Sequence, residues 1–390
     1  MEKIAMVGVG YVGLVSGTGL ADFGNEVICV DIDDDKIEKL KNDILPIYEP
    51  GLLDIVRRNV EKGRLKFTTD LTKSIRESNV IFLAVPTPSG KNGEVDLSYV
   101  FNVIDKIAEI IESYKVIVTK STVEVGTGDK IRERLITKGI SENMFDIVSN
   151  PEFLREGSAV RDFMHPDRVV IGTDSKKAID IMKGIYRSLY LLETPVVVTD
   201  VRTAEMIKYA SNAFLATKIS FINEIANICE RIGANIQEVA KAMGLDGRIS
   251  SKFLHAGPGF GGSCFPKDTL ALTKMAEKIG IKSAIVEAVI DVNEKQKKVV
   301  VEKLLKFVPD LSGKTIGILG LAFKPNTDDV RDAPALTVIK EILSLGGQIK
   351  AYDPEAMNEM RKHYPEITYV ASSEDAIKAV SYTHLTLPTN

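Results

Sequence analysis

The chain has little of several residue types that would mark other classes of protein. Three cysteines occur in 390 residues and no pair has Cys-x-x-Cys spacing, so we expect neither a disulfide framework nor a structural zinc site. The four histidines show no metal-ligand spacing, and we expect no metal. The N-terminus enters a strand without a charged leader, and no apolar run approaches membrane-spanning length. These features favour a cytoplasmic protein without a membrane segment.

Charge is also unbiased. The 54 acidic and 50 basic residues are interspersed and leave a net charge of −4. Proteins that bind nucleic acids or membrane surfaces cluster their basic residues, so neither partner is expected. With 44% hydrophobic and 27% charged residues, the composition is that of a globular chain of two or three domains.

Short apolar runs alternate with helical patterns through the first half of the chain. This alternation predicts βαβ units and a parallel, Rossmann-type sheet. We assign residues 1–200 to this domain. The predicted strands are Ile4–Val9, Glu26–Asp31, Val80–Val85, Val116–Thr119 and Asp146–Ser149, and the clearest helices are Tyr11–Phe23 and Asp34–Asn42.

The pattern changes after residue 200. A long amphipathic helix is predicted over Val201–Met243, a Gly-rich loop over His255–Phe265, and helix again over Asp268–Phe307. We assign residues 201–311 to a central helical domain. Residues 312–390 read as a second, smaller Rossmann-like domain, with strands at Lys314–Leu319 and Gln348–Tyr352 around a helix at Pro334–Leu345.

The last ten residues do not continue this pattern. Ser381–Asn390 has no helical period and no charge, and it follows a predicted helix at Glu374–Val380. A doubly wound domain should supply another buried strand here. We therefore expect an incomplete third domain to which these ten residues do not belong.

Glycines follow the first strand in the order of a dinucleotide-binding turn. Gly8 permits the tight turn, Gly10 admits a pyrophosphate, and Gly13 lets the helix pack on the strand. Asp31 ends the second strand, about twenty residues on, where a carboxylate accepts from adenine-ribose hydroxyls and repels a 2′-phosphate. This context predicts NAD and disfavours the alternative of a tight turn with a solvent-facing aspartate.

Two further loops leave the carboxyl ends of predicted strands, where doubly wound sheets bind ligands. They contain Thr87, in Pro86-Thr87-Pro88, and Thr122, in Lys120-Ser121-Thr122. Two interpretations fit these positions equally well. The threonines contact the cofactor or a catalytic water, or they are ordinary turn residues.

Cys264 is the candidate nucleophile. It leaves a loop with four glycines between Gly257 and Gly262, a composition that brings backbone amides close to phosphate oxygens. A helix then begins with Lys267 and Asp268, and a helix N-terminus and a lysine both lower a thiol pKa. A thiolate beside a nicotinamide indicates oxidation through a thiohemiacetal and a thioester. Cys29 and Cys229, in a strand and on an apolar helix face, are better explained as core residues.

Such chemistry also requires groups that hold an oxyanion or move a proton. Lys208 and Asn212 are four residues apart on the predicted long helix and therefore share a face, where they can stabilise an oxyanion. Surface residues are the usual explanation of such a pair. Glu152 and Glu156 lie in a loop after a strand. Two interpretations are open: one of them acts as the base that assists water, or the loop is simply acidic and solvated.

These motifs together resemble the UDP-glucose/GDP-mannose dehydrogenase family, from Met1 to about Val380. The family oxidises C6 of a nucleotide sugar twice, with two NAD per sugar, and forms dimers through the central helix. The matching segments are Gly8–Gly13, Lys120-Ser121-Thr122, Asn150–Gly157, Pro166-Asp167-Arg168, Glu205–Asn212, Phe253–Asp268, Gly320–Pro325 and Asp328–Arg331.

The resemblance implies a role for each site residue. Cys264 would form the thioester, Lys208, Asn212 and Asp268 would hold oxyanions and water, and Glu152 would be the acid/base, with Thr122 and water. NAD contacts would come from Gly8, Gly10, Tyr11, Val12, Gly13, Asp31, Lys36, Thr87, Thr122, Glu156, Lys267 and Arg331. Substrate contacts would come from Glu152, Phe153, Leu154, Arg155, Lys208, Asn212, Arg248, Phe253, Leu254, His255, Ala256, Gly257, Gly261, Phe323 and Lys324, with Arg248 reaching a neighbour's site.

The substrate is less constrained than the reaction. Within the family, Asn150–Gly157 and Arg248-Ile249 resemble the members that oxidise UDP-glucose to UDP-glucuronate, and this resemblance implies UDP-glucose as the substrate. GDP-mannose and a UDP-N-acetylhexosamine remain alternatives. The family's last domain continues further and usually carries a late arginine near the uridine, so an inactive form that only binds nucleotides is a third possibility.

Overall fold

The computed structural model describes residues 1–90, 93–378, 380 and 382–386, with the side chains of 382–386 left out. The chain divides into two compact units, 1–209 and 210–390. The three-domain boundaries expected from the sequence stay a prediction. Within the described ranges, no helix is both long and apolar enough to cross a membrane.

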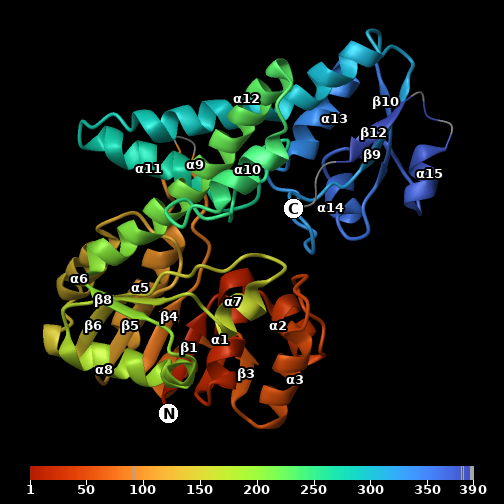
Figure 1. Ribbon diagram of the computed structural model, residues 1–390. Coiled ribbons are helices and arrows are strands. Elements are labelled where there is room, and N and C mark those ends of the chain that lie inside the picture. Colours follow the sequence, from red (N-terminus) through yellow and green to blue (C-terminus); the bar gives the residue numbers. More distant parts are fainter. Residues whose placement is uncertain (91–92, 379, 381, 387–390) are drawn as a thin grey trace. The chain divides into compact units, whose positions relative to one another are not determined.

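Unit 1 is built on an eight-stranded sheet in the order β3-β2-β1-β4-β5-β6-β7-β8 (Figure 1). All neighbouring strands are parallel except β6 and β7, which confirms the predicted Rossmann-type sheet. The strands are β1 (Lys3–Val7), β2 (Glu26–Val30), β3 (Leu65–Thr68), β4 (Val80–Leu83), β5 (Lys115–Thr119), β6 (Phe145–Ser149), β7 (Val169–Gly172) and β8 (Val196–Thr199).

Successive side chains of a strand point to opposite faces of the sheet. In this unit the side chains on both faces are apolar and buried. Ile4 and Met6 of β1 belong to one apolar core, whereas Ala5 and Val7 belong to the other. Both faces are therefore buried, as parallel sheets require. The helices of this unit are α1 (Tyr11–Asp22), α2 (Asp34–Lys41), α3 (Leu52–Glu61), α4 (Leu71–Glu77), α5 (Ser98–Ile110), α6 (Thr127–Thr137), α7 (Ala159–Met164) and α8 (Lys176–Ile185).

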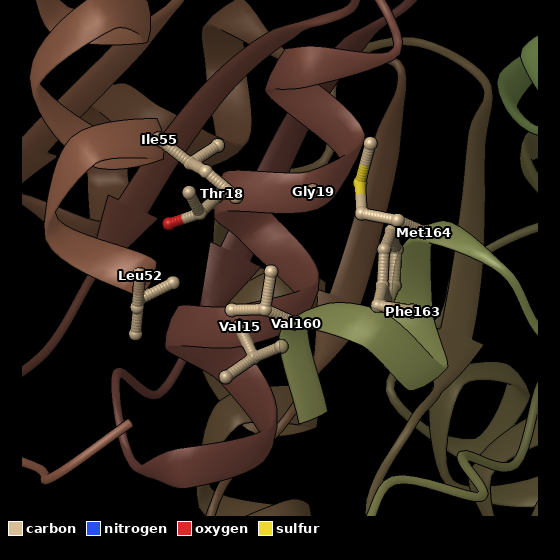
Figure 2. A pocket seen from close by; sticks show the side chains of 8 residues that line it. All are labelled: Val15, Thr18, Gly19, Leu52, Ile55, Val160, Phe163 and Met164. Carbon is tan, nitrogen blue, oxygen red and sulfur yellow. The ribbon is translucent and has the colours of Figure 1, made fainter. Parts of the chain in front are cut away.

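Helix α1 packs against α3 and α7 on one side of the sheet. Their side chains meet in an apolar seam with a void of about 10 Å³ (Figure 2), which is at the limit of the space that one water molecule needs. The void is a packing gap in the core and not a ligand site. It is lined by Val15, Thr18, Gly19, Leu52, Ile55, Val160, Phe163 and Met164.

Helix α9 (Val201–Ile232) begins in unit 1 and continues into unit 2, where α10 (Ile236–Gly244), α11 (Phe265–Lys278) and α12 (Ala284–Phe307) follow. Two predicted helices were too long. The first breaks at Gly233 and the second at Gly280, each with a positive φ, of 76° and 75°. An L-residue rarely adopts this conformation, so glycine ends a helix there.

A four-stranded parallel sheet, in the order β11-β10-β9-β12, completes unit 2. Its strands are β9 (Thr315–Leu319), β10 (Gln348–Tyr352), β11 (Thr368–Tyr369) and β12 (Tyr382–Thr386), and its helices are α13 (Pro334–Ser344), α14 (Met357–Arg361) and α15 (Ser373–Ile377).

Strand β12 corrects the expectation for the tail. Residues 382–386 pair in parallel with β9, so this stretch supplies the additional strand that we expected the domain to lack. The remaining tail residues, 381 and 387–390, lie outside the described residues.

Candidate active site

The turn between β1 and α1 has the geometry that a dinucleotide requires. Gly8 has a φ of +98°, and a Cβ there would lie 2.6 Å from the Ala84 carbonyl oxygen. At Gly13 a Cβ would lie 1.9 Å from the Gly8 carbonyl oxygen, whereas at Gly10 it would meet nothing within 4 Å. Gly8 and Gly13 are therefore required by packing. Gly10 faces open space, as a position approached by a ligand does.

The amino end of α1 suits an anion. Gly10 caps the helix without a side-chain hydrogen bond, and the first turn holds no acidic residue. Tyr11 and Val12 belong to this turn. Free amides and the helix dipole at such an end favour phosphate, so the residues present fit the pyrophosphate of NAD.

Asp31 follows β2, as predicted. Its carboxylate accepts from the Val9 amide at 2.9 Å and from Lys36 Nζ at 3.1 Å. The first bond ties the aspartate to the glycine turn. Lys36 is the ion-pair partner of Asp31, and the contacts of both residues with NAD stay a prediction.

Glu49 is a buried carboxylate that the sequence analysis did not single out. It accepts from the Tyr11 hydroxyl, from the Gly157 amide at 2.7 Å and from the Val160 amide at 3.2 Å. Burial, reinforced by Glu49, raises the pKa of Tyr11 far above its usual value. Glu49 thereby links the first turn of α1 to the loop that carries Glu152.

The loops after β4 and β5 hold the two predicted threonines. Thr87 and Thr122 are both partly buried. The second loop is fixed by Ser121, whose hydroxyl donates to the Val85 carbonyl at 2.6 Å. Both threonines therefore lie at the carboxyl edge of the sheet, and their contacts with a ligand stay a prediction.

Glu152 and Lys208 form a buried ion pair. Lys208 Nζ donates to the Glu152 carboxylate at 2.8 Å and to its backbone carbonyl at 2.7 Å. Burial raises the pKa of Glu152, but the charge and hydrogen bond of Lys208 outweigh it, and the pKa is lowered overall. The solvated loop and the surface lysine are thus the wrong explanations of these two residues.

A second buried lysine lies beside this pair. Lys120 Nζ donates to Asn150 Oδ1 at 3.0 Å and lies 3.5 Å from the Tyr186 hydroxyl, which itself donates to Asn150 Oδ1 at 2.6 Å. We named the Lys120-Ser121-Thr122 motif but gave a role only to Thr122. The position of Lys120 directly after a buried strand is the sequence feature that indicates it as a further candidate site residue.

The rest of the Glu152 loop is held by charged contacts. The Arg168 guanidinium lies 3.4 Å from the centre of the Phe153 ring, and Arg155 pairs with Asp162 at 2.6 Å. The Leu154 amide donates to the Glu152 carboxylate at 2.5 Å. Glu156 is partly buried in the same loop.

In unit 2, Cys264 caps the amino end of α11 and is partly exposed, whereas Cys29 and Cys229 are buried. Its thiol lies 3.5 Å from the Ser263 hydroxyl. The ring of the next residue, Phe265, packs edge-on against Phe260. The cysteine is therefore presented at the start of a helix whose first residue is anchored in the core.

Asp268 is one turn into α11 and only 1% exposed. It accepts from Asn212 Nδ2 of α9 at 2.6 Å and from Lys267 Nζ at 2.6 Å. Asn212 is itself buried. The structure thus brings Asp268, Asn212 and Lys267 together, and two of them, Lys267 and Asp268, follow closely after Cys264 in the sequence.

The Gly-rich loop lies against residues 320–333. A Cβ at Gly261 would lie 2.4 Å from the Asp332 carbonyl oxygen, and one at Gly262 would lie 2.8 Å from the Phe323 ring. Arg331, bonded to Asp329 through its side chain, accepts from the Gly262 amide through its carbonyl. The predicted residues Gly261, Phe323, Lys324 and Arg331 therefore belong to two loops in direct contact.

The loop begins with a strained turn. Phe253 has a φ of +65°, and Leu254 is buried while His255 is exposed and Ala256 partly buried. The Gly257 amide donates to Asn223 Oδ1 at 2.7 Å, which fixes the loop to α9. Arg248, ahead of the loop, pairs with Asp246 at 2.6 Å and is otherwise exposed.

Comparison with known proteins identifies the family. The three domains of the UDP-glucose/GDP-mannose dehydrogenase family match in order: the NAD binding domain over residues 2–190, the central domain over 202–295 and the UDP binding domain over 317–387. The chain belongs to the UDP-glucose/GDP-mannose dehydrogenase family and is an NAD-dependent dehydrogenase.

Individual relatives favour one branch. A UDP-glucose 6-dehydrogenase of Bacillus subtilis is 55% identical over 359 residues, covering 92% of this chain and 77% of the relative. A UDP-glucose dehydrogenase structure from Pyrobaculum islandicum is 38% identical with a TM-score of 0.94, covering 98% of this chain and 89% of that one. A UDP-D-ManNAc dehydrogenase from Pyrococcus horikoshii is 26% identical with a TM-score of 0.85, covering 97% and 88%.

Proposed function

We propose that this protein oxidises UDP-glucose to UDP-glucuronate, with Cys264 as the covalent nucleophile. The observation that carries the proposal is the partly exposed Cys264 at the start of α11, one turn before an aspartate held by Asn212 and Lys267. Incubation with UDP-glucose and NAD should yield two NADH per sugar. A single NADH, or a free aldehyde product, would refute it.

The glycine turn and Asp31 would hold NAD, which when bound would accept the hydride in both oxidations. The chain's own groups manage the protons and the negative charge. In the first oxidation the C6 carbon loses a hydride and its hydroxyl loses a proton. Lys208 stabilises the alkoxide electrostatically, because its ammonium is buried and therefore poorly screened. Glu152, with Thr122 and water, receives the proton.

The second stage uses the cysteine. The Cys264 thiolate adds to the aldehyde carbon, and the carbonyl oxygen takes up a proton to give a thiohemiacetal. Loss of a hydride and of the hydroxyl proton leaves a thioester. Asn212 donates to the oxyanion, Asp268 holds the water that attacks the thioester carbon, and Glu152 takes up the proton that this water loses. The carbon–sulfur bond then breaks, and the carboxylate and the thiolate are released.

Closely related substrates are the main alternatives. The family also includes GDP-mannose and UDP-N-acetylhexosamine dehydrogenases, and an overall fold does not identify a sugar. The higher identity to UDP-glucose dehydrogenases favours UDP-glucose. A panel of the three nucleotide sugars decides among them. Binding of NAD and UDP-glucose without any NADH would indicate an inactive form.

We also propose a homodimer formed through α9, in the cytoplasm, where the three free thiols would remain reduced. Phe214, Phe221 and Ile228 recur every seven residues along α9 and are exposed, and Ile232 extends the same apolar stripe. Such spacing is typical of helices that pair. Phe221→Glu should convert a dimer to a monomer in sedimentation equilibrium, whereas Ile136→Glu, at an exposed position of α6, should not.

A further inference from the structure

Lys120, Lys208 and Glu152 form a buried cluster near the carboxyl edge of the unit 1 sheet. Lys120 and Lys208 are each 4% exposed and Glu152 is 6% exposed. Lys208 pairs directly with Glu152. Lys120 instead donates to the neutral side chain of Asn150. When both lysines are protonated and Glu152 is ionised, these three side chains carry a net charge of about +1.

Asn150 ties this second lysine to the loop of Glu152. Its backbone amide donates to the Thr119 carbonyl at the end of β5, and its Nδ2 donates to the Val170 carbonyl of β7 at 2.7 Å. Its Oδ1 accepts from both Lys120 and Tyr186. Asn150 therefore joins three neighbouring strands, two residues before Glu152.

We infer that Lys120 is a positioning residue for the reaction: through Asn150 it fixes the loop that presents Glu152, and its buried charge supports Lys208 in keeping that carboxylate ionised. Lys120 acts through Asn150 and through its charge, without touching the substrate. The inference rests on the proposed function, in which Glu152 accepts the proton from the C6 hydroxyl.

The charges around Lys120 set the direction of the effect. Three titratable groups face it: Glu152 from the loop after β6, Lys208 from α9 and Tyr186 from the end of α8. Burial lowers the pKa of Lys120 to about 8, against the attraction of Glu152. Lys120 also lowers the pKa of Glu152. Removing the ammonium therefore raises the pKa of Glu152.

Three substitutions separate the anchor from the charge. Lys120→Arg keeps the charge, Lys120→Gln keeps a donor for Asn150 without the charge, and Lys120→Met removes both. Lys115 offers a matched control at the other end of β5. It is also buried, and it donates to the carbonyls of Ser78 at 2.5 Å and Arg76 at 3.2 Å, away from Glu152.

The measurements are kcat and KM for UDP-glucose oxidation across pH, together with thermal unfolding. Lys120→Gln and Lys120→Met should move the acidic limb of the kcat profile to higher pH by about one unit, the usual effect of one nearby charge. Lys120→Arg should leave the limb in place. Lys115→Met should lower the Tm and leave the limb unchanged.

Lys120→Met should also lower kcat by about tenfold or more, with a smaller change in KM, because the base is misplaced and not the substrate. An unshifted limb in both Lys120→Gln and Lys120→Met overturns the inference. So does an equal shift in Lys115→Met, since the effect would then follow from the loss of any buried lysine at either end of β5.

A second readout needs no turnover. The infrared band of the protonated Glu152 carboxyl, identified by its loss in Glu152→Gln, should appear at higher pH in Lys120→Gln than in the wild type. An unchanged titration would refute the role of the charge even if the wild type proves inactive toward UDP-glucose. Failure of the inference is thus distinguished from failure of the proposed function.

Discussion

Asn212 donates a hydrogen bond of 2.6 Å to Asp268, a carboxylate that is almost fully buried. The bond joins α9 to the first turn of α11, one turn after Cys264. A buried carboxylate that loses a donor keeps its desolvation cost without the compensating bond. The pair therefore contributes to stability as well as to the proposed chemistry.

Asn212→Ala should lower the free energy of unfolding by about 2 kcal/mol, the usual loss for a hydrogen bond to a charged group. Urea denaturation measures the change. Asn227→Ala is the matched control, because Asn227 lies on the same helix and donates to the neutral Gln296 at 2.8 Å. Its loss should be smaller. Equal losses would mean that the charge of Asp268 is unimportant.

Alkylation should distinguish the three thiols. Iodoacetamide should modify Cys264, which is partly exposed, and spare the native Cys29 and Cys229, which are buried. Burial also raises the pKa of Cys29 to about 12, so its reactive thiolate is scarce at neutral pH. Mass spectrometry of peptides from the folded protein gives the sites.

The same cysteine should be required for turnover. Cys264→Ala should abolish UDP-glucuronate formation and leave NAD binding, measured by calorimetry, within about twofold of the wild type. Cys229→Ala should retain activity, because its buried thiol has no proposed role. Acid formation at the wild-type rate by Cys264→Ala would remove the thioester from the mechanism.

Glu49 should matter for the fold of unit 1. Glu49→Ala removes the acceptor for two backbone amides and for Tyr11, and it should cost about 3 kcal/mol because these groups lose a buried charged partner. Glu77→Ala, at an exposed ion pair of 4.0 Å with Lys73, should cost less than about 1 kcal/mol. Guanidinium denaturation compares the two.

Glu205 should make stability depend on pH. Burial raises its pKa from 4.5 to about 7, although it accepts from the Gly126 and Gly128 amides. The folded state then binds more protons than the unfolded state between these pH values, so the free energy of unfolding falls as pH rises through that window. Above it, the ionised Glu205 costs roughly 3 kcal/mol.

Glu205→Gln should flatten this part of the stability profile, measured by denaturation at pH 5, 6, 7 and 8. Glu133→Gln is a suitable control, since Glu133 is exposed on α6. If the free energy of unfolding of the wild type instead rises from pH 5 to 8, and Glu205→Gln abolishes that rise, the expected direction is wrong.

Much of the fold was predictable because its signals are local. The apolar run at Ile4–Val7 and the glycines at Gly8, Gly10 and Gly13 each depend on a few neighbouring residues. The helix breaks at Gly233 and Gly280 were missed, since an isolated glycine costs a helix little and its φ is decided by the surrounding packing.

The sequence indicated several candidate site residues but not the pairs that they form. Lys208 and Asn212 were grouped because they share a helix face, yet Lys208 binds Glu152 and Asn212 binds Asp268. These partners are 56 residues away in each case. Sequence spacing carries no information about such contacts. Glu49 was missed for the same reason.

The contact between the Gly-rich loop and residues 320–333 leaves no room for a side chain at Gly261 or Gly262. A side chain at Gly261 would strike the backbone at Asp332, and one at Gly262 would strike the Phe323 ring. An engineer who wants this chain to accept a bulkier nucleotide sugar would therefore have to redesign both loops together. Libraries that vary the Gly-rich loop alone should return mainly unfolded or inactive clones.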